Sequence, residues 1–212
     1  MALKIDELNN LTSAKVKRAI PFRQYFEEMD LEEEQISKRV EHSEKLSPIL
    51  FFIITLVLIY IEYGYEDYED IAEQLRQGYL ELLGEEGVEI DQDILDYLEE
   101  FSKEFVETTV KRAEEEFFTS DDRADVVAEN EANVIFNHEE FKEAIKEGKT
   151  YKIWVTEEDE RVRDTHKAVN EKTIPIDEYF TVGDSYMLYP KDISLGASMT
   201  EIANCRCHIE YV

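Results

Sequence analysis

Apolar residues recur every three or four positions from Leu3 to about Phe118, and this spacing constrains the fold more than any other feature of the chain. Residues at that spacing line one face of an α-helix, whereas a half-buried strand needs alternation with a period of two. Only 7 glycines and 4 prolines occur among the 212 residues, so such helices have few places to end. Because each helix is apolar on one face, the helices must bury those faces against one another or against a partner. We therefore predict a helical N-terminal half.

Cap and turn residues indicate where these helices begin and end. Ser47 followed by Pro48 is typical of a helix start, and the apolar spacing continues from there to Leu82. The two glycines of segment 84–87 then break the helix, and Asp91 can cap the next one.

A further helix start is predicted at residues 119–122, where Ser and Asp are favoured as caps. We expect one helix from there to Ile135, and a second, short helix over 138–146. Gly148 then ends the helical part of the chain.

Beyond this glycine the sequence becomes β-prone. Segment 151–155 (Tyr-Lys-Ile-Trp-Val) alternates as a strand does. One face of this strand carries Tyr151, Ile153 and Val155. Residues 179–182 can form a short strand, and the ending 206–212 can pair with residues 152–155. The whole chain is thus predicted to be α+β, with a helical N-terminal half and a small C-terminal domain with a few strands.

One segment, Ile49–Ile61, is apolar and uncharged over 13 residues. A membrane-spanning helix needs roughly 18 such residues, so we predict a helix that is buried in a bundle or an assembly rather than in a membrane. The run is longer than a lone helical hairpin easily covers, which favours a contact with another protein through residues such as Phe52 and Ile59.

The charge balance is strongly acidic, with 51 Asp and Glu against 23 Lys and Arg and a formal net charge of −28. Proteins bind nucleic acids largely by neutralising phosphates with Lys and Arg, and the sequence contains no basic run. Direct DNA binding is therefore not expected. The acidic surface is either a solvated helical surface or a face that docks on a basic protein.

The two cysteines, Cys205 and Cys207, are separated by one residue. We expect no disulfide between these two closely spaced residues. The N-terminus lacks the charged start and apolar run of a signal peptide, so we expect reduced thiols in an intracellular protein.

Polar residues gather in the last third of the chain. Asp159, Arg163 and His166 have the spacing i, i+4 and i+7, which places them on one face of a helix. An Asp–Arg pair at this spacing can form a salt bridge, and the histidine can join it. We interpret this group as a hydrogen-bonded clamp that stabilises a small domain with a thin core.

Two chemical alternatives use the same residues. His166, Cys205 and Cys207, together with His208 or Asp159, would supply ligands that zinc accepts, although structural zinc sites usually have cysteines two to four residues apart. A cysteine nucleophile with His166 as base and Asp159 as its orienting partner is the other alternative, but no glycine-rich elbow or oxyanion site accompanies it. Nucleotide-binding, HExxH and GxSxG motifs are absent from the sequence.

These residues resemble a known family. The segment Trp154–His166, a loop with Gly183 and Pro190, and the ending Asn204-Cys-Arg-Cys207 are similar, in order and spacing, to the phage Mu protein F-like domain. Upstream, Arg123–Glu131 resembles the helix of that domain that ends in a glutamate. The resemblance covers about residues 121–210. In the family a glycine usually follows the Asn or Asp after the histidine, whereas here Glu171 follows Asn170, so a type I′ turn is in doubt.

The resemblance implies a minor head protein of a tailed bacteriophage, made in the host cytoplasm and entering the virion at the portal vertex or capsid interior. It implies a partner among portal, capsid or scaffold proteins. Residues 1–120 would be the helical assembly region and residues 121–212 the family domain. Because only five residues follow Cys207, we expect no effector domain after it.

We therefore predict no catalytic residues, no metal and no cofactor. The metal-dependent enzyme or injected effector, built on His166, Cys205 and Cys207, stays the alternative function. The predicted structural clamp comprises Glu131, Trp154, Asp159, Arg163, His166, Cys205, Arg206 and Cys207.

Overall fold

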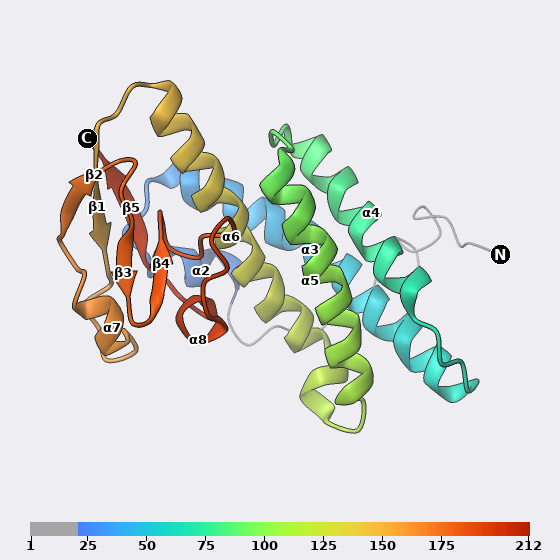
Figure 1. Cartoon of the computed structure of the whole chain (residues 1–212). Coiled ribbons are helices and arrows are strands. Elements are labelled where there is room, and N and C mark those ends of the chain that lie inside the picture. The colour runs from blue at the N-terminus through green and yellow to red at the C-terminus, as the bar shows by residue number, and fades with distance from the viewer. Residues whose placement is uncertain (1–20) are drawn as a thin grey trace. The chain divides into compact units, whose positions relative to one another are not determined.

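The computed structural model describes residues 21–212, so the helical pattern predicted before Pro21 lies outside the described residues. Helices dominate the chain up to residue 146 and strands follow, which confirms the α+β prediction (Figure 1). The helical elements in this part are α2 (Phe22–Glu27), α3 (Glu33–Glu62), α4 (Glu69–Glu86), α5 (Gln92–Lys111), the 3₁₀ turn η1 (Glu116–Thr119) and α6 (Asp121–Lys146).

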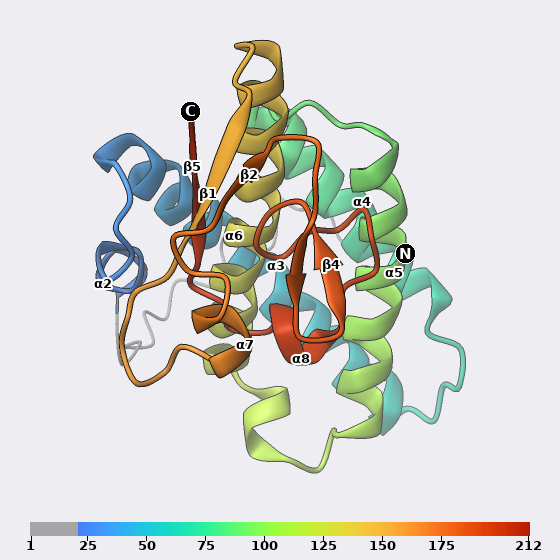
Figure 2. The same ribbon diagram turned by 60° about the vertical axis from the view of Figure 1, so that its left-hand side comes forward.

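Two small antiparallel sheets form the C-terminal part. In the first sheet β1 (Tyr151–Val155) lies between β2 (Thr173–Pro175) and β5 (His208–Tyr211) (Figure 2). Lys152 pairs with Tyr211 and Val155 with His208, so the predicted pairing of the chain ending with residues 152–155 is confirmed. The second sheet joins β3 (Phe180–Val182) to β4 (Ser185–Met187). Two single-turn helices, α7 (Asp164–Lys167) and α8 (Met199–Ile202), lie in the connections.

The described chain divides into two compact units that alternate along the sequence. One contains residues 42–90 and 95–128, and the other contains 22–41, 91–94 and 129–212. The predicted division at residue 120 is between an assembly region and a family domain. It concerns the function of these segments, and it stays a prediction.

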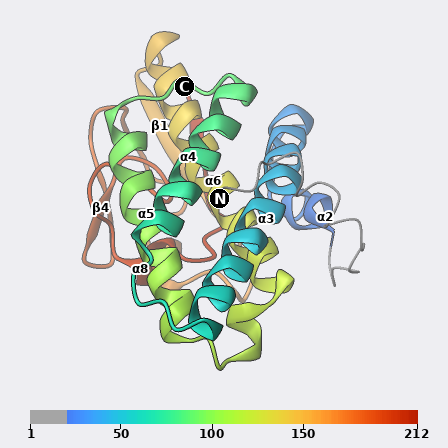
Figure 3. The same ribbon diagram turned by 90° about the vertical axis from the view of Figure 1, so that its right-hand side faces the viewer.

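In the first unit, α3, α4 and α5 pack as neighbours (Figure 3). The part of α3 in this unit buries one apolar stripe completely: Leu46, Leu50, Ile53, Ile54 and Val57. His42 bridges α3 to α4, with Nδ1 at 2.7 Å from Glu86 and Nε2 at 3.1 Å from the Tyr79 hydroxyl. These contacts satisfy buried polar groups beside the apolar stripe, as burial away from water requires.

The predicted start of this helix at Ser47-Pro48 is wrong, because Pro48 lies inside α3. The buried apolar residues of α3 already begin with Ile36, about three turns before the proline. Packing of these residues outweighs the loss of one backbone hydrogen bond at Pro48. The Ser47 hydroxyl does not cap a helix. It donates to Asp125 at 2.5 Å.

The same helix also ends earlier than predicted. Gly64 adopts a left-handed φ of 72°, and the amide of Tyr65 returns to the carbonyl of Tyr60 at 2.9 Å. This glycine motif closes α3 before α4 begins at Glu69. The end predicted at segment 84–87 is confirmed, since Gly87 caps α4 with a φ of 77°.

The two helices predicted after residue 119 are one continuous helix, α6. Residues 131–138 are all buried, so the periodicity that would separate an inner from an outer face is lost there. Gly148 ends this part with a φ of 77°, as predicted. The cap predicted at Asp91 is also present, because its carboxylate accepts from the Ile94 amide at 3.0 Å.

A buried arginine holds together the helices of the second unit. Arg39 has no exposed surface and donates to Asn133, Asn137 and Glu140 of α6 at 3.1, 2.9 and 2.8 Å. Because a buried guanidinium is stable only when its N–H groups are paired, this network fixes the start of α3 on α6.

The first sheet buries the face opposite to the one that its apolar pattern indicates. Lys152 and Trp154 have no exposed surface, whereas Tyr151 is 49% exposed. Trp154 packs edge-to-face on His166 and on Phe180. The aliphatic stem of Lys152 can be buried because its ammonium group reaches the carbonyl of Ile176 at 2.8 Å.

Helix α3 also has the length and composition of a membrane-spanning helix over an 18-residue window, of which 28% is buried. The length of the apolar run, 13 uncharged residues, is therefore by itself not enough to argue against a membrane-spanning helix. A core or interface helix passes the same length test, and the buried stripe with its polar contacts fits that case.

Glu171 offers a test of the turn between α7 and β2. It adopts a φ of 59°, a left-handed conformation that favours glycine. We predict that Glu171→Gly stabilises the protein by about 1 kcal/mol, because glycine enters this region without steric strain. Glu171→Ala, which keeps the strain, is the control and should change little. Urea denaturation measures both, and a glycine variant that is less stable than the alanine variant would contradict the prediction.

Candidate functional site

The predicted clamp residues lie in the second compact unit, on segments that border β1 and β5. Trp154 is on β1, His166 is on α7, and Cys205 to Cys207 immediately precede β5. Helix α8 presents Glu201, with Ser198 as its N-cap accepting from the Thr200 amide at 3.3 Å. The site is therefore assembled from segments about forty residues apart in the sequence.

The helix predicted to carry Asp159, Arg163 and His166 on one face does not form. Only Asp164–Lys167 is helical, and Glu158 has a left-handed φ of 53°. The Asp159 carboxylate accepts from the Arg161 amide at 2.9 Å, which is a local turn that competes with helical hydrogen bonding.

The side chains of Asp159 and Arg163 do not pair with each other, and each has different partners. Arg206 donates to Asp159 at 2.6 Å, and Arg161 donates to Asp159 at 3.1 Å. Arg163 donates instead to the carbonyl of Ala203, which holds the chain just before the cysteines. The predicted Asp159–Arg163 bridge is thus replaced by two separate contacts to the 203–206 segment.

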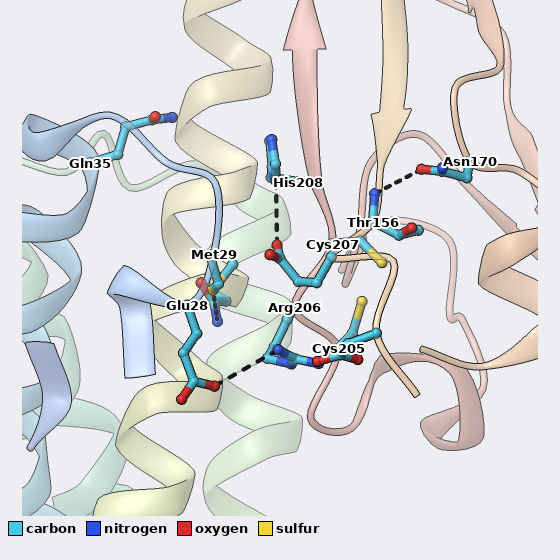
Figure 4. A network of polar contacts seen from close by, with 12 residues as sticks. Glu28, Met29, Gln35, Thr156, Asn170, Cys205, Arg206, Cys207 and His208 are labelled. Carbon is cyan, nitrogen blue, oxygen red and sulfur yellow. Dashed lines mark hydrogen bonds and ion pairs between the residues drawn. The ribbon is translucent and has the colours of Figure 1, made fainter. Parts of the chain in front are cut away.

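Arg206 and its partners form an ion-pair group at the surface of the unit. Arg206 lies 3.9 Å from Glu28, and Arg161 donates to Glu28 at 2.8 Å (Figure 4). The hydrogen bond from Arg206 lowers the pKa of Asp159 to about 2. This group ties the segment after α2 to the loop before β5.

The two cysteines converge on the histidine. Asn204 has a left-handed φ of 52°, and the strand predicted from residue 206 begins only at His208, after both cysteines. His166 Nδ1 lies 3.3 Å from the Cys207 Sγ and 3.6 Å from the Cys205 Sγ. Figure 4 shows the two sulfur atoms pointing toward each other. Both thiols are buried and free.

The other nitrogen of the imidazole is held by a carboxylate. His166 Nε2 lies 3.1 Å from Glu201, and the same carboxylate oxygen accepts from the Thr165 hydroxyl at 2.8 Å. Gly183 leaves room for this glutamate, because a Cβ there would lie 2.5 Å from its Oε1. A glycine at position 183 therefore has a steric reason as well as its positive φ of 59°.

The cluster is electrostatically polarised. A hydrogen bond from Cys207 lowers the pKa of Cys205 well below its ordinary value; burial opposes this shift and His166 adds to it. The same hydrogen bond to Cys205 raises the pKa of Cys207. Burial opposes protonation of His166, yet its hydrogen bond to Cys205 and the charge of that thiolate raise the pKa of the imidazole. Burial lowers the pKa of Lys191, which lies near both thiols, to about 8.

The sequence analysis did not identify Asn130, Lys191 or Glu201. Lys191 is fully buried and donates to the Asn130 side chain, which also accepts from the Asn204 amide at 3.2 Å. Glu131, the next residue on α6, is buried too, and its charge acts on Lys191. Neither Lys191 nor Glu201 belongs to a sequence motif, and Glu201 is one of 51 acidic residues, so nothing in the local sequence points to a role in this site.

A cavity of about 20 Å³ lies beside the cluster, lined by His166, both cysteines, Arg163 and Glu157 among others. Roughly 10–15 Å³ suffices for one water molecule, so this cavity accepts a water or an ion rather than an organic substrate. His208 and Asp159, the fourth zinc ligands considered from the sequence, are not in the group formed by His166, Cys205 and Cys207.

The lowered pKa of Asp159 predicts an acid-sensitive contact. A depressed carboxyl pKa stabilises the fold above the ordinary value of about 4, and this stabilisation is lost as the pH falls toward 2. We expect Asp159→Asn to unfold more easily than the wild type at pH 6 and equally easily near pH 2. Denaturation at a series of pH values measures this. Asp164→Asn is the control, because that side chain is fully exposed. A constant difference across the pH range would contradict the prediction.

The family comparison agrees with the motif resemblance and extends it. The family described as phage Mu protein F like protein matches residues 66–210, so the match also includes α4 and α5, well before residue 121. No curated protein and no solved structure matches the chain significantly. Because the family match covers more than half of its length, the chain belongs to the phage Mu protein F-like family of phage head-morphogenesis proteins.

Proposed function

We propose that this protein is a non-enzymatic minor head component that joins the portal vertex or the capsid interior during assembly. Family membership supports a role in head morphogenesis. The single observation that carries the non-enzymatic part is the burial of the cluster, because His166 and both cysteines are buried beside a cavity of only about 20 Å³. Nucleophilic catalysis needs access of a substrate to the thiol, and this cavity leaves room for little more than water.

In this proposal the cluster and its ion pairs brace the second unit. The contacts of Arg206, Arg163 and Glu201 all join the cysteine segment to other segments. A unit whose strands are three to five residues long has a small core, so such polar braces contribute a large share of its stability.

The partner surface in this proposal is the outer side of α3. Ile59 is 41% exposed and Phe52 is half-buried, while the opposite stripe of the helix is packed. An apolar surface on a protein with a net charge of −28 fits a partner that offers an apolar groove with a basic rim. Portal protein is the partner that we propose, with capsid and scaffold proteins as the other possibilities in the same assembly.

We predict that Ile59→Asp reduces co-purification with the portal protein, and incorporation into proheads, at least tenfold without lowering the melting temperature. A charge in the centre of an apolar interface is left without water or a partner. Ile145→Asp is the matched control, because Ile145 is also exposed, at 50%, but lies on α6. Normal incorporation of the Ile59 variant, or partition of the wild type into membranes, would contradict the proposal.

We also predict that His166→Ala lowers the free energy of unfolding by about 2 kcal/mol, because it leaves the Glu201 carboxylate and two thiols without their common partner. Chemical denaturation measures the loss. Lys167→Ala, at an exposed neighbouring position, should change stability by less than about 0.5 kcal/mol. A His166 variant that unfolds like the wild type would show that the cluster does not brace the fold.

A further inference from the structure

Three atoms that bind soft metal ions meet in one buried place. His166 Nδ1, Cys205 Sγ and Cys207 Sγ all lie within 4.8 Å of one another, and all three residues are buried. Thiolate sulfur and imidazole nitrogen are both ligands that zinc accepts. The three atoms therefore form a set of candidate zinc ligands.

The distances between these atoms fit a tetrahedral metal. Zinc lies about 2.3 Å from thiolate sulfur and about 2.0–2.1 Å from histidine nitrogen, so the two atoms are roughly 3.6 Å apart at the tetrahedral angle. His166 Nδ1 is 3.3 Å from one sulfur and 3.6 Å from the other. Small shifts of the side chains would complete three corners of the tetrahedron.

The imidazole is oriented for coordination through Nδ1. The Glu201 carboxylate lies 3.1 Å from Nε2 and can only accept when ionised, so the proton of the neutral ring belongs on Nε2. The Nδ1 lone pair is then directed at the two sulfurs. A carboxylate behind the metal-binding histidine is the usual second partner in zinc sites, where it fixes the tautomer and the ring orientation. The Thr165 hydroxyl in turn holds that carboxylate at 2.8 Å.

The fourth position opens onto the small cavity. Its volume of about 20 Å³ is enough for one water molecule. Glu157 also lines the cavity, and its buried Oε1 lies 4.0 Å from His208 Nδ1.

The charges of the neighbouring residues are compatible with a divalent ion. Two thiolates neutralise its charge of two, which removes the penalty for burying it. Lys191 is directed to Asn130, and Arg163 donates to the carbonyl of Ala203, so both cations have partners of their own.

We propose that His166, Cys205 and Cys207 bind one zinc ion that crosslinks α7 to the segment before β5. Zinc is favoured over harder ions by the two thiolates and over copper(II) by the tetrahedral spacing. The ion would have a structural role, joining positions about forty residues apart, and the proposal does not depend on which head protein the chain contacts.

Metal analysis of the untagged full-length protein, purified without chelator from zinc-supplemented medium and exhaustively dialysed, tests this proposal. We expect about one zinc per chain in the wild type. Cys207→Ser should reduce the content at least fivefold. Asp93→Asn is the control, because Asp93 belongs to the other group with ligand-like spacing, Asp91, Asp93 and His138, and it should keep the full content.

A second measurement applies if the cysteine variant does not fold. Cobalt(II) added to metal-free wild-type protein should produce thiolate-to-cobalt absorption and the visible bands of a tetrahedral site, and one equivalent of zinc should abolish them. A strong chelator should lower the melting temperature of the wild type. Less than a tenth of a zinc per chain together with the absence of these bands would overturn the proposal, and so would a disulfide between the two cysteines in the purified protein.

Discussion

His166 is buried between a carboxylate and two thiols, and we propose that the C-terminal unit depends on this interaction. The Nε2 atom of the imidazole contacts Glu201 on α8, and its Nδ1 atom contacts the two cysteines before β5. Trp154 packs against its ring, so the same side chain also connects the polar cluster to the apolar core. A buried polar group of this kind stabilises a fold only when every partner is in place.

The supports around this histidine explain several features that otherwise look unrelated. Gly183 is required because Glu201 occupies the space of its missing side chain. Asn130 accepts from both the Lys191 ammonium and the Asn204 amide, so α6 fixes the two ends of segment 191–204, which carries α8 and leads into the cysteines. Arg206 points away from the thiols and forms ion pairs with Asp159 and Glu28. The Cys-Arg-Cys segment thus directs its sulfurs toward His166 and its guanidinium toward Asp159 and Glu28.

The fold class and the strand pairing could be predicted from the sequence, because periodicity and β-prone segments are local signals. The helix boundaries were less accessible. Pro48 is inside α3 because packing of the apolar stripe outweighs a missing hydrogen bond, and α6 is continuous because its middle is buried all round. The residues of the candidate site could be chosen from the motif, but their contacts could not. Asp159 pairs with Arg206, 47 positions away, rather than with Arg163 four positions away. Spacing on an assumed helix gave the wrong partner because the local turn at Asp159 prevents that helix.

Hydrogen exchange of the native protein, resolved by segment, tests most directly whether the cluster braces the unit. If His166 and the cysteines join α7 and β5 to the core, the slowest amides of residues 164–169 and 207–211 should exchange with the same opening free energy as those of β1, through one cooperative unfolding event. Exchange of both segments at a much lower opening free energy, while β1 stays protected, would contradict the account. In that case the cluster would be a local contact that the rest of the unit does not need.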